Sequence, residues 1–190
     1  MGAISLEQLK KRHMAVDAVI DLLKERDINI VFETGTCFGH LTYQLAEYEP
    51  LKQIITVELS HELFNIAKDR EGINKDKIEF LYGDSKDLLP IYAKKIKEPV
   101  LWYLDAHYCN VENNLGADGS FPVFEEMMAI RNRPYADIVW VDDVHCMGHR
   151  HRLGQPWERL HYNSILSVFS DRVDKSIRNI SDGVVIYLNV

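Results

Sequence analysis

The stretch that decides the fold is Val31–Thr42, with the sequence VFETGTCFGHLT. An apolar run, Ile28–Phe32, leads into it, and a segment with apolar residues at helical spacing follows it. Between them, Gly35 permits a sharp turn of the backbone, and Gly39 permits close approach of a ligand or a helix. The stretch is therefore typical of a strand, a tight turn and a helix whose first amides can face an anionic group.

The same alternation of strand and helix continues along the chain. Strands are predicted at 28–32, 54–57, 78–82, 100–104, 138–141, 173–180 and 184–188, and helices near 5–23, 41–48, 60–67, 85–97, 121–131 and 157–169. Helices between the first five strands indicate a parallel sheet covered on both faces. The last two strands are joined by too few residues for a crossover, so they should pair antiparallel. We predict one α/β domain over 1–190, with a doubly wound, mostly parallel seven-stranded sheet that ends in a C-terminal antiparallel hairpin.

Composition limits the classes of partner. The chain has 190 residues, 46% of them apolar and 27% charged, which is ordinary for a globular domain. Its net charge of -7 argues against binding nucleic acid through the phosphate backbone. An odd number of cysteines (Cys37, Cys109 and Cys146) suggests free thiols and a reducing compartment. With neither a signal-peptide pattern nor an apolar run of membrane-spanning length, we expect a cytoplasmic protein with no membrane and no nucleic-acid partner.

Acidic side chains follow each of the first five predicted strands. They are Glu33, Glu58, Asp84, Asp105 and the pair Asp142-Asp143. In open parallel sheets, ligands bind beyond the carboxyl ends of the strands. A single Asp at such a position is most simply a helix or turn cap, but five successive strand ends with a carboxylate favour a shared binding site.

The first of these carboxylates suit an adenosyl amino acid. Glu33 offers two acceptor oxygens to an ammonium group, and exposed amides at the following helix start suit a carboxylate. Glu58 lies 19 residues after Gly39, where a carboxylate can accept both hydroxyls of a ribose. Asp84 and Ser85 can reach an adenine edge, or they can cap the next helix, and the two roles are compatible.

With Glu58 and Asp84, the string from Glu33 to Gly39 (ETGTCFG) resembles the first three motifs of the class I S-adenosylmethionine-dependent methyltransferases. The likeness extends over nearly the whole chain, including the terminal hairpin, and implies a Rossmann-like methyltransferase fold with S-adenosylmethionine as cofactor. The residues that it implies for cofactor binding are Glu33, Gly35, Thr36, Gly39, Thr42, Glu58, Asp84, Ser85 and Asp105. The third glycine of a dinucleotide fingerprint is missing, which disfavours a nicotinamide cofactor.

Two further strings, LDAHY at 104–108 and VDDVH at 141–145, follow the fourth and fifth strands. Clustered carboxylates repel one another unless they are protonated or bridged by a cation, and Mg²⁺ is the simplest bridge. The arrangement resembles metal-dependent small-molecule O-methyltransferases, including those that modify sugars in polysaccharide biosynthesis. This resemblance implies Asp105, Asp142 and Asp143 as metal ligands. Alternatively, Asp105 contacts the methionine end of the cofactor, and Asp143 caps a helix.

The same two strings carry the candidate catalytic bases. His107 and His145 each lie two residues beyond an Asp, and imidazole can accept a proton from a hydroxyl near neutral pH. Together with Asp105, they form the predicted catalytic set. The predicted reaction is methyl transfer to an oxygen of a small polar acceptor such as a sugar or sugar phosphate. A nitrogen is the less favoured acceptor atom. The alternatives are an NAD-dependent oxidoreductase and a non-catalytic nucleotide-binding module.

The sequence indicates less clearly which residues bind the methyl acceptor. Arg150 and Arg152 can bind a phosphorylated acceptor or can be ordinary surface charges. Residues 109–120 have the composition of a mobile lid or of a plain surface loop. A short chain leaves an acceptor site that is either shallow or completed by another subunit, as in a homodimer.

Overall fold

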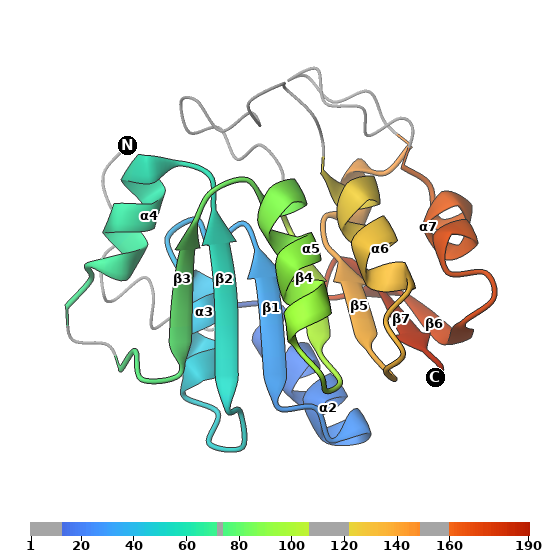
Figure 1. The fold of residues 1–190 in the computed structure, drawn as a ribbon, viewed down its shortest axis with the longest axis horizontal. Helices are drawn as coiled ribbons and strands as arrows, with labels where there is room; N and C mark the ends of the chain where they lie inside the picture. Colours follow the sequence, from blue (N-terminus) through green and yellow to red (C-terminus); the bar gives the residue numbers. More distant parts are fainter. Residues whose placement is uncertain (1–12, 72–73, 107–121, 149–159) are drawn as a thin grey trace.

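The computed structural model describes residues 13–71, 74–106, 122–148 and 160–190 (Figure 1). Its strands are β1 (Ile30–Thr34), β2 (Gln53–Glu58), β3 (Ile78–Tyr82), β4 (Leu101–Leu104), β5 (Ile138–Val141), β6 (Val173–Ile180) and β7 (Gly183–Leu188). Its helices are α2 (Val16–Arg26), α3 (His40–Ala46), α4 (His61–Lys68), α5 (Ser85–Lys95), α6 (Val123–Arg131), α7 (Tyr162–Val168) and a 3-10 turn, η1 (Val144–Cys146). No helix within these ranges is long and apolar enough to cross a membrane.

All seven strands form one sheet in the order β3-β2-β1-β4-β5-β7-β6. The first five strands are parallel, and β7 runs antiparallel to both β5 and β6. This arrangement confirms the predicted doubly wound sheet with its terminal hairpin. The chain winds outward from β1 to β3 and then returns to the other side of β1 as β4. The carboxyl ends of β1 and β4 are therefore the switch point of the strand order, where ligands bind in such sheets.

Helices cover both faces of the sheet (Figure 1). Because neighbouring residues of a strand point to opposite faces, Phe32 and Trp102 pack with α5 and α6, while Val31 and Tyr103 pack with α2 and α3. Every residue of β1, β4, β5 and β7 is buried, as expected for strands covered on both sides. The two cores hold the strand ends at fixed positions along one edge.

The first strand differs from its prediction. The predicted strand covers 28–32, but β1 covers Ile30–Thr34, because the amide of Ile28 bonds to the carbonyl of Leu23 and closes the end of α2. The strand continues through Glu33 and Thr34 because partners inside the protein satisfy these polar side chains. Glu33 is therefore part of the strand and does not follow it.

Other boundaries shift by a few residues. Ser60 caps α4, as predicted, and Asp84 caps α5, which begins at Ser85. α7 begins at Tyr162, after a capping box between His161 and Ser164, so residues 160 and 161 precede the helix and do not belong to it as predicted. The first part of this predicted helix, 157–159, lies outside the described residues. The predicted helix start at 5–12 lies outside the described residues.

The β6–β7 hairpin brings its turn to the carboxyl edge of the sheet. Ser181 and Asp182 form the turn with φ of 46° and 70°, a left-handed conformation that Asp tolerates better than most residues. Since Val184 pairs with Val141 at the end of β5, Asp182 lies at the edge where the parallel strands end.

Candidate active site

Glu33 is a buried acid at the end of β1. Its Oε2 accepts hydrogen bonds from the hydroxyl of Thr42 on α3 and, at 2.6 Å, from that of Thr56 on β2. Burial raises the pKa of Glu33 to about 7, the two hydroxyl donors oppose this shift, and the charge of Glu58 adds to it. The result is a carboxyl group that would ionise readily if a cation, such as an ammonium, came near.

The glycine loop connects β1 to α3. The amides of Gly35 and Thr36 donate to the carbonyl of Val57 at 2.9 and 3.1 Å, so the loop is anchored to the end of β2. Gly35 has a φ of 85°, and a Cβ there would overlap the carbonyl of Asp105, whose carbon would lie only 2.9 Å away. Gly35 is thus required both for the turn and for the close contact between the ends of β1 and β4.

Glu58 lies at the end of β2, beside this loop. Its Oε2 accepts from the amide of Cys37 at 2.7 Å, and its Oε1 accepts from the amide of Ser60 at 2.8 Å. Burial raises its pKa, and the amide donors oppose the shift. The structure therefore brings Glu33 and Glu58 to the same region. Backbone amides of Ser60, Cys37 and Leu59 donate to Glu58, so a carboxylate with about four acceptor positions keeps room for a further donor such as a hydroxyl.

Asp84 and Ser85 mark the start of α5. Asp84 caps the helix, with its Oδ1 accepting from the amide of Lys86 at 3.1 Å. Ser85 is buried, and its hydroxyl bonds to Glu126 of α6. The capping role considered from the sequence is therefore present, and a contact with adenine stays a prediction.

Asp142, at the end of β5, is held by two aromatic donors. Its Oδ2 accepts from the hydroxyl of Tyr103 at 2.7 Å and its Oδ1 from the indole Nε1 of Trp140 at 3.2 Å, and these two rings stack. Burial raises the pKa of Asp142, and the charge of Asp143 adds to the shift. Burial also raises the pKa of Tyr103, helped by the charges of Asp142 and Asp105. Both oxygens of Asp142 are thus engaged within the protein.

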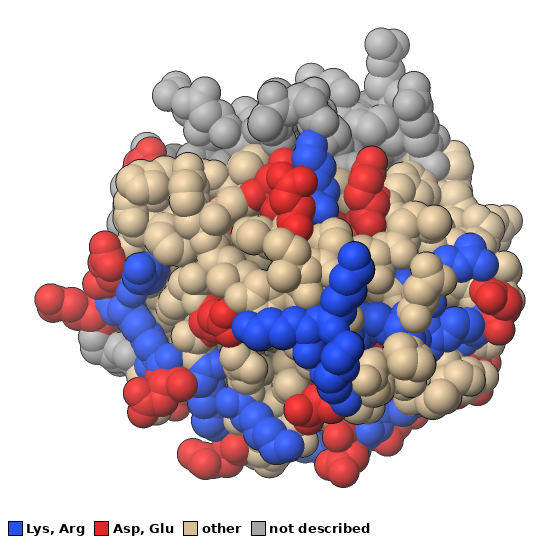
Figure 2. Space-filling model, viewed as in Figure 1, with Lys and Arg blue, Asp and Glu red and all other residues tan. Residues whose placement is uncertain are grey.

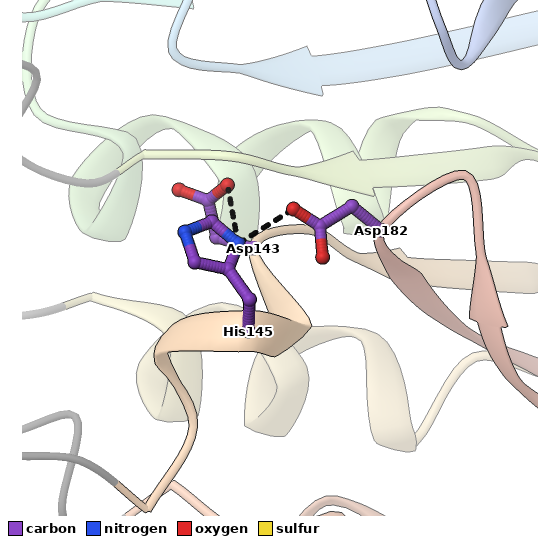
Figure 3. A group of neighbouring side chains, drawn as sticks. All are labelled: Asp143, His145 and Asp182. Carbon is purple, nitrogen blue, oxygen red and sulfur yellow. Dashed lines mark hydrogen bonds and ion pairs between the residues drawn. The ribbon is translucent and has the colours of Figure 1, made fainter.

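A different set of side chains converges at the same edge (Figure 3). His145 Nδ1 lies 2.6 Å from Asp182 Oδ2 and 3.8 Å from Asp143 Oδ1. One ligand atom from each of these residues lies within 4.8 Å of the others, which suits a metal ion. Of the predicted metal ligands, only Asp143 belongs to this group. The sequence did not predict Asp182, because only the register between β7 and β5 brings residue 182 near the end of β5.

Several predicted residues lie outside the described parts of the chain. They are His107, Arg150, Arg152 and the segment 109–120. On the face that carries α5 and α6, most basic side chains are spread over the lower part of the view, away from the carboxyl edge of the sheet, and they include Lys94, Lys95 and Arg131 in the last turns of these helices (Figure 2). Near that edge, the same view shows acidic side chains with a basic side chain between them (Figure 2).

The strand order, with a glycine loop after β1 at the switch point, defines the class I methyltransferase fold. Solved structures share it. TomG, an O-methyltransferase from Streptomyces achromogenes in complex with S-adenosylmethionine, is 21% identical, with 99% of this chain and 82% of that chain covered and a TM-score of 0.60. The methyltransferase PaMTH1 from Podospora anserina, bound to S-adenosylhomocysteine, is 17% identical over 96% of this chain and 81% of that chain, with a TM-score of 0.57. An O-methyltransferase from Bacillus cereus is 19% identical over 98% of this chain and 82% of that chain, with a TM-score of 0.52.

At these identities, the likeness establishes the fold, and it confirms the architecture expected from the sequence. No protein-family profile matches the chain, and no curated protein matches it by sequence.

Proposed function

We propose that this protein transfers a methyl group from S-adenosylmethionine to a hydroxyl group of a small polar acceptor. The observation that carries the proposal is the pair of buried carboxyls, Glu33 and Glu58, on either side of a glycine loop at the switch point of the sheet. The three solved structures named above contain S-adenosylmethionine or its demethylated product. The acidic surroundings favour a cationic ligand over a pyrophosphate, which two carboxylates would repel.

In this proposal, each part of the cofactor meets a group of matching chemistry. Glu33 accepts from the ammonium of the methionine part, and Glu58 accepts from the ribose hydroxyls. The start of α5, Asp84 and Ser85, lies on the adenine side. The acceptor oxygen attacks the methyl carbon in line, the bond from carbon to sulfur breaks, and S-adenosylhomocysteine leaves. The protein contributes mainly by holding the two reactants in this alignment.

The proton of the acceptor hydroxyl must pass to a base. His145 is the described candidate, because Asp182 engages its Nδ1 and so favours a tautomer whose Nε2 can accept a proton. Cys146 Sγ lies 3.3 Å from that Nε2, so a bound acceptor would take the place of the thiol. His107 is the second candidate from the sequence.

The alternative to His145 as the base is a divalent cation that takes His145 as one of its ligands. Asp143, His145 and Asp182 offer two carboxylates and an imidazole, a donor set that suits Mn²⁺ or Zn²⁺ at least as well as the Mg²⁺ expected from the sequence. A bound cation would lower the pKa of an acceptor hydroxyl. The set proposed from the sequence (Asp105, Asp142 and Asp143) shares one member with this group, so replacing Asp143 tests both.

A calorimetric titration of Mn²⁺ into the protein distinguishes the two proposed sets of metal ligands. Asp143→Asn should weaken binding at least tenfold in either case, whereas Asp182→Asn should do so only if the converging group holds the ion. Asp171→Asn, which changes an exposed carboxylate at the other end of β6 from Asp182, should have no effect. Activity that survives EDTA, with no Mn²⁺ binding, would refute a metal role and leave the imidazole as the base.

The cofactor is tested by calorimetry with S-adenosylhomocysteine and with NAD. We expect the first to bind and the second not to bind. Glu58→Ala should weaken binding of S-adenosylhomocysteine by at least about tenfold to a hundredfold, because the loss of even one charge-assisted hydrogen bond costs about 1.5–3 kcal/mol. Glu62→Ala, an exposed acid in the first turn of α4, is the matched control. Tight binding of NAD alone would refute the proposal in favour of an oxidoreductase.

For the acceptor, we propose a sugar or sugar phosphate, as in polysaccharide biosynthesis. A screen with methyl-labelled cofactor against free and phosphorylated sugars tests this. Binding of S-adenosylhomocysteine without methylation of any acceptor would favour a non-catalytic nucleotide-binding module. Size-exclusion chromatography with light scattering tests the proposed homodimer.

A further inference from the structure

Glu126 is an acid buried at a position that suits an apolar residue. It lies on α6 with 1% of its surface exposed, beside the buried side chains of Val123, Met127 and Ile130. Its carboxyl group takes hydrogen bonds from the hydroxyls of Ser85 and Thr34, while Oε1 has no hydrogen-bond partner among the described residues. Burial raises its pKa to about 7, and the neighbouring charges of Asp84 and Glu125 add to the shift.

The partners of Glu126 belong to separate segments of the proposed cofactor site. Thr34 is the last residue of β1, directly before Gly35 of the glycine loop, and its Oγ1 accepts from the amide of Asp105 at 3.2 Å. Ser85 is the first residue of α5. One carboxyl group on α6 therefore connects the end of β1, the residue after β4 and the start of α5.

An apolar side chain would stabilise the fold more simply at this position. A buried acid needs hydrogen bonds to offset its loss of hydration, and this one leaves an oxygen without a partner. Its neighbours on the same face of α6 show that the surrounding core accepts apolar groups. What the carboxyl adds is a fixed distance between Thr34 and Ser85, which packing alone would hold less strictly.

We propose that Glu126 is a positioning residue of the cofactor site, which fixes the start of α5 against the ends of β1 and β4. This inference rests on the proposed binding of S-adenosylmethionine. In the proposed binding mode, the groups that Glu126 holds, at the glycine loop and at the start of α5, would face the adenine side of the cofactor. The consequence is measured as affinity for the adenosyl ligand and not as stability alone.

The test compares Glu126→Leu and Glu126→Gln by calorimetry with S-adenosylhomocysteine. The Leu variant removes the acceptor and should bind about tenfold more weakly. The Gln variant keeps a carbonyl oxygen that accepts from both hydroxyls, so its affinity should stay within about threefold of the original protein. The control is Glu125→Leu, one residue earlier on α6 with an exposed side chain, which should leave the affinity unchanged. Circular dichroism and urea unfolding confirm that the compared variants are folded.

Thr34→Val provides the same test from the other end, in case Glu126→Leu does not fold. It removes the hydroxyl that bonds to Glu126 and that accepts from the amide of Asp105, with little change in shape, and affinity should fall several-fold. A folded Glu126→Leu or Thr34→Val variant with unchanged affinity would overturn the inference, and so would a Gln variant as weak as the Leu variant. If the original protein itself binds no S-adenosylhomocysteine, the proposed function falls, and this inference falls with it.

Discussion

Replacing Glu33 by Gln should change how stability depends on pH. Burial raises the pKa of Glu33 from 4.5 to about 7 in the folded protein. Since one pKa unit corresponds to about 1.4 kcal/mol, ionising this group costs the fold about 3 kcal/mol. Because the folded value is the higher one, the contribution of Glu33 is fully present below pH 4.5 and is lost as the pH rises through about 7.

Gln keeps a carbonyl oxygen for the hydroxyls of Thr42 and Thr56, but it does not titrate. Urea unfolding should be measured at several values from about pH 4.5 to about pH 8. The free energy of unfolding of the original protein should fall over this range by about 3 kcal/mol more than that of Glu33→Gln. Glu126 titrates in both proteins, so its contribution cancels in the difference, whereas the repulsion between Glu33 and Glu58 is part of the measured effect.

Glu47→Gln is the matched control for this experiment, because Glu47 is an exposed acid directly after α3. It should show the same pH dependence as the original protein. If Glu33→Gln also shows that dependence, Glu33 is not the strongly shifted group, and the reasoning from its burial is wrong.

The same carboxyl links ligand binding to proton release. An ammonium bound to Glu33 would stabilise its charged form, so binding at pH 7 should release about half a proton. Calorimetry with S-adenosylhomocysteine in buffers of different ionisation enthalpy measures this number, and Glu33→Gln should bring it close to zero. Equal proton release by both proteins would mean that the ammonium is bound elsewhere.

Three further changes test the fold around the site by urea unfolding. Gly35→Ala should destabilise the protein by about 2–4 kcal/mol, because its left-handed φ of 85° and the adjacent carbonyl both exclude a Cβ, and a smaller effect would mean that the loop can move away. Arg133→Met should cost about 3–5 kcal/mol, since it leaves Asp137 buried without its 2.7 Å partner, and adding Asp137→Leu should recover part of the loss. Tyr103→Phe should cost about 1–3 kcal/mol and raise the pKa of Asp142 further, and unchanged stability would show that this bond contributes nothing.

Local sequence determined most of the architecture. Apolar runs of strand length, separated by helical segments, predicted the parallel sheet, and the short link between 180 and 184 predicted the antiparallel hairpin. Ser60 and Asp84 were identifiable as caps because capping depends on residues close in sequence. The carboxylates at strand ends were predicted to meet because parallel strands end at one edge, and Glu33 and Glu58 do lie together there.

What only the tertiary structure decided was the set of partners for each polar group. Asp182 reaches His145 because of the register between β5 and β7, and that register is set by packing across the sheet. In the sequence, Glu125 and Glu126 form an ordinary acidic pair, and only the orientation of α6 against α5 exposes one and buries the other. Sequence patterns record which side chains share a face of one element. The angle and register between elements follow from the fit of many side chains at once, and these decide which distant groups come into contact.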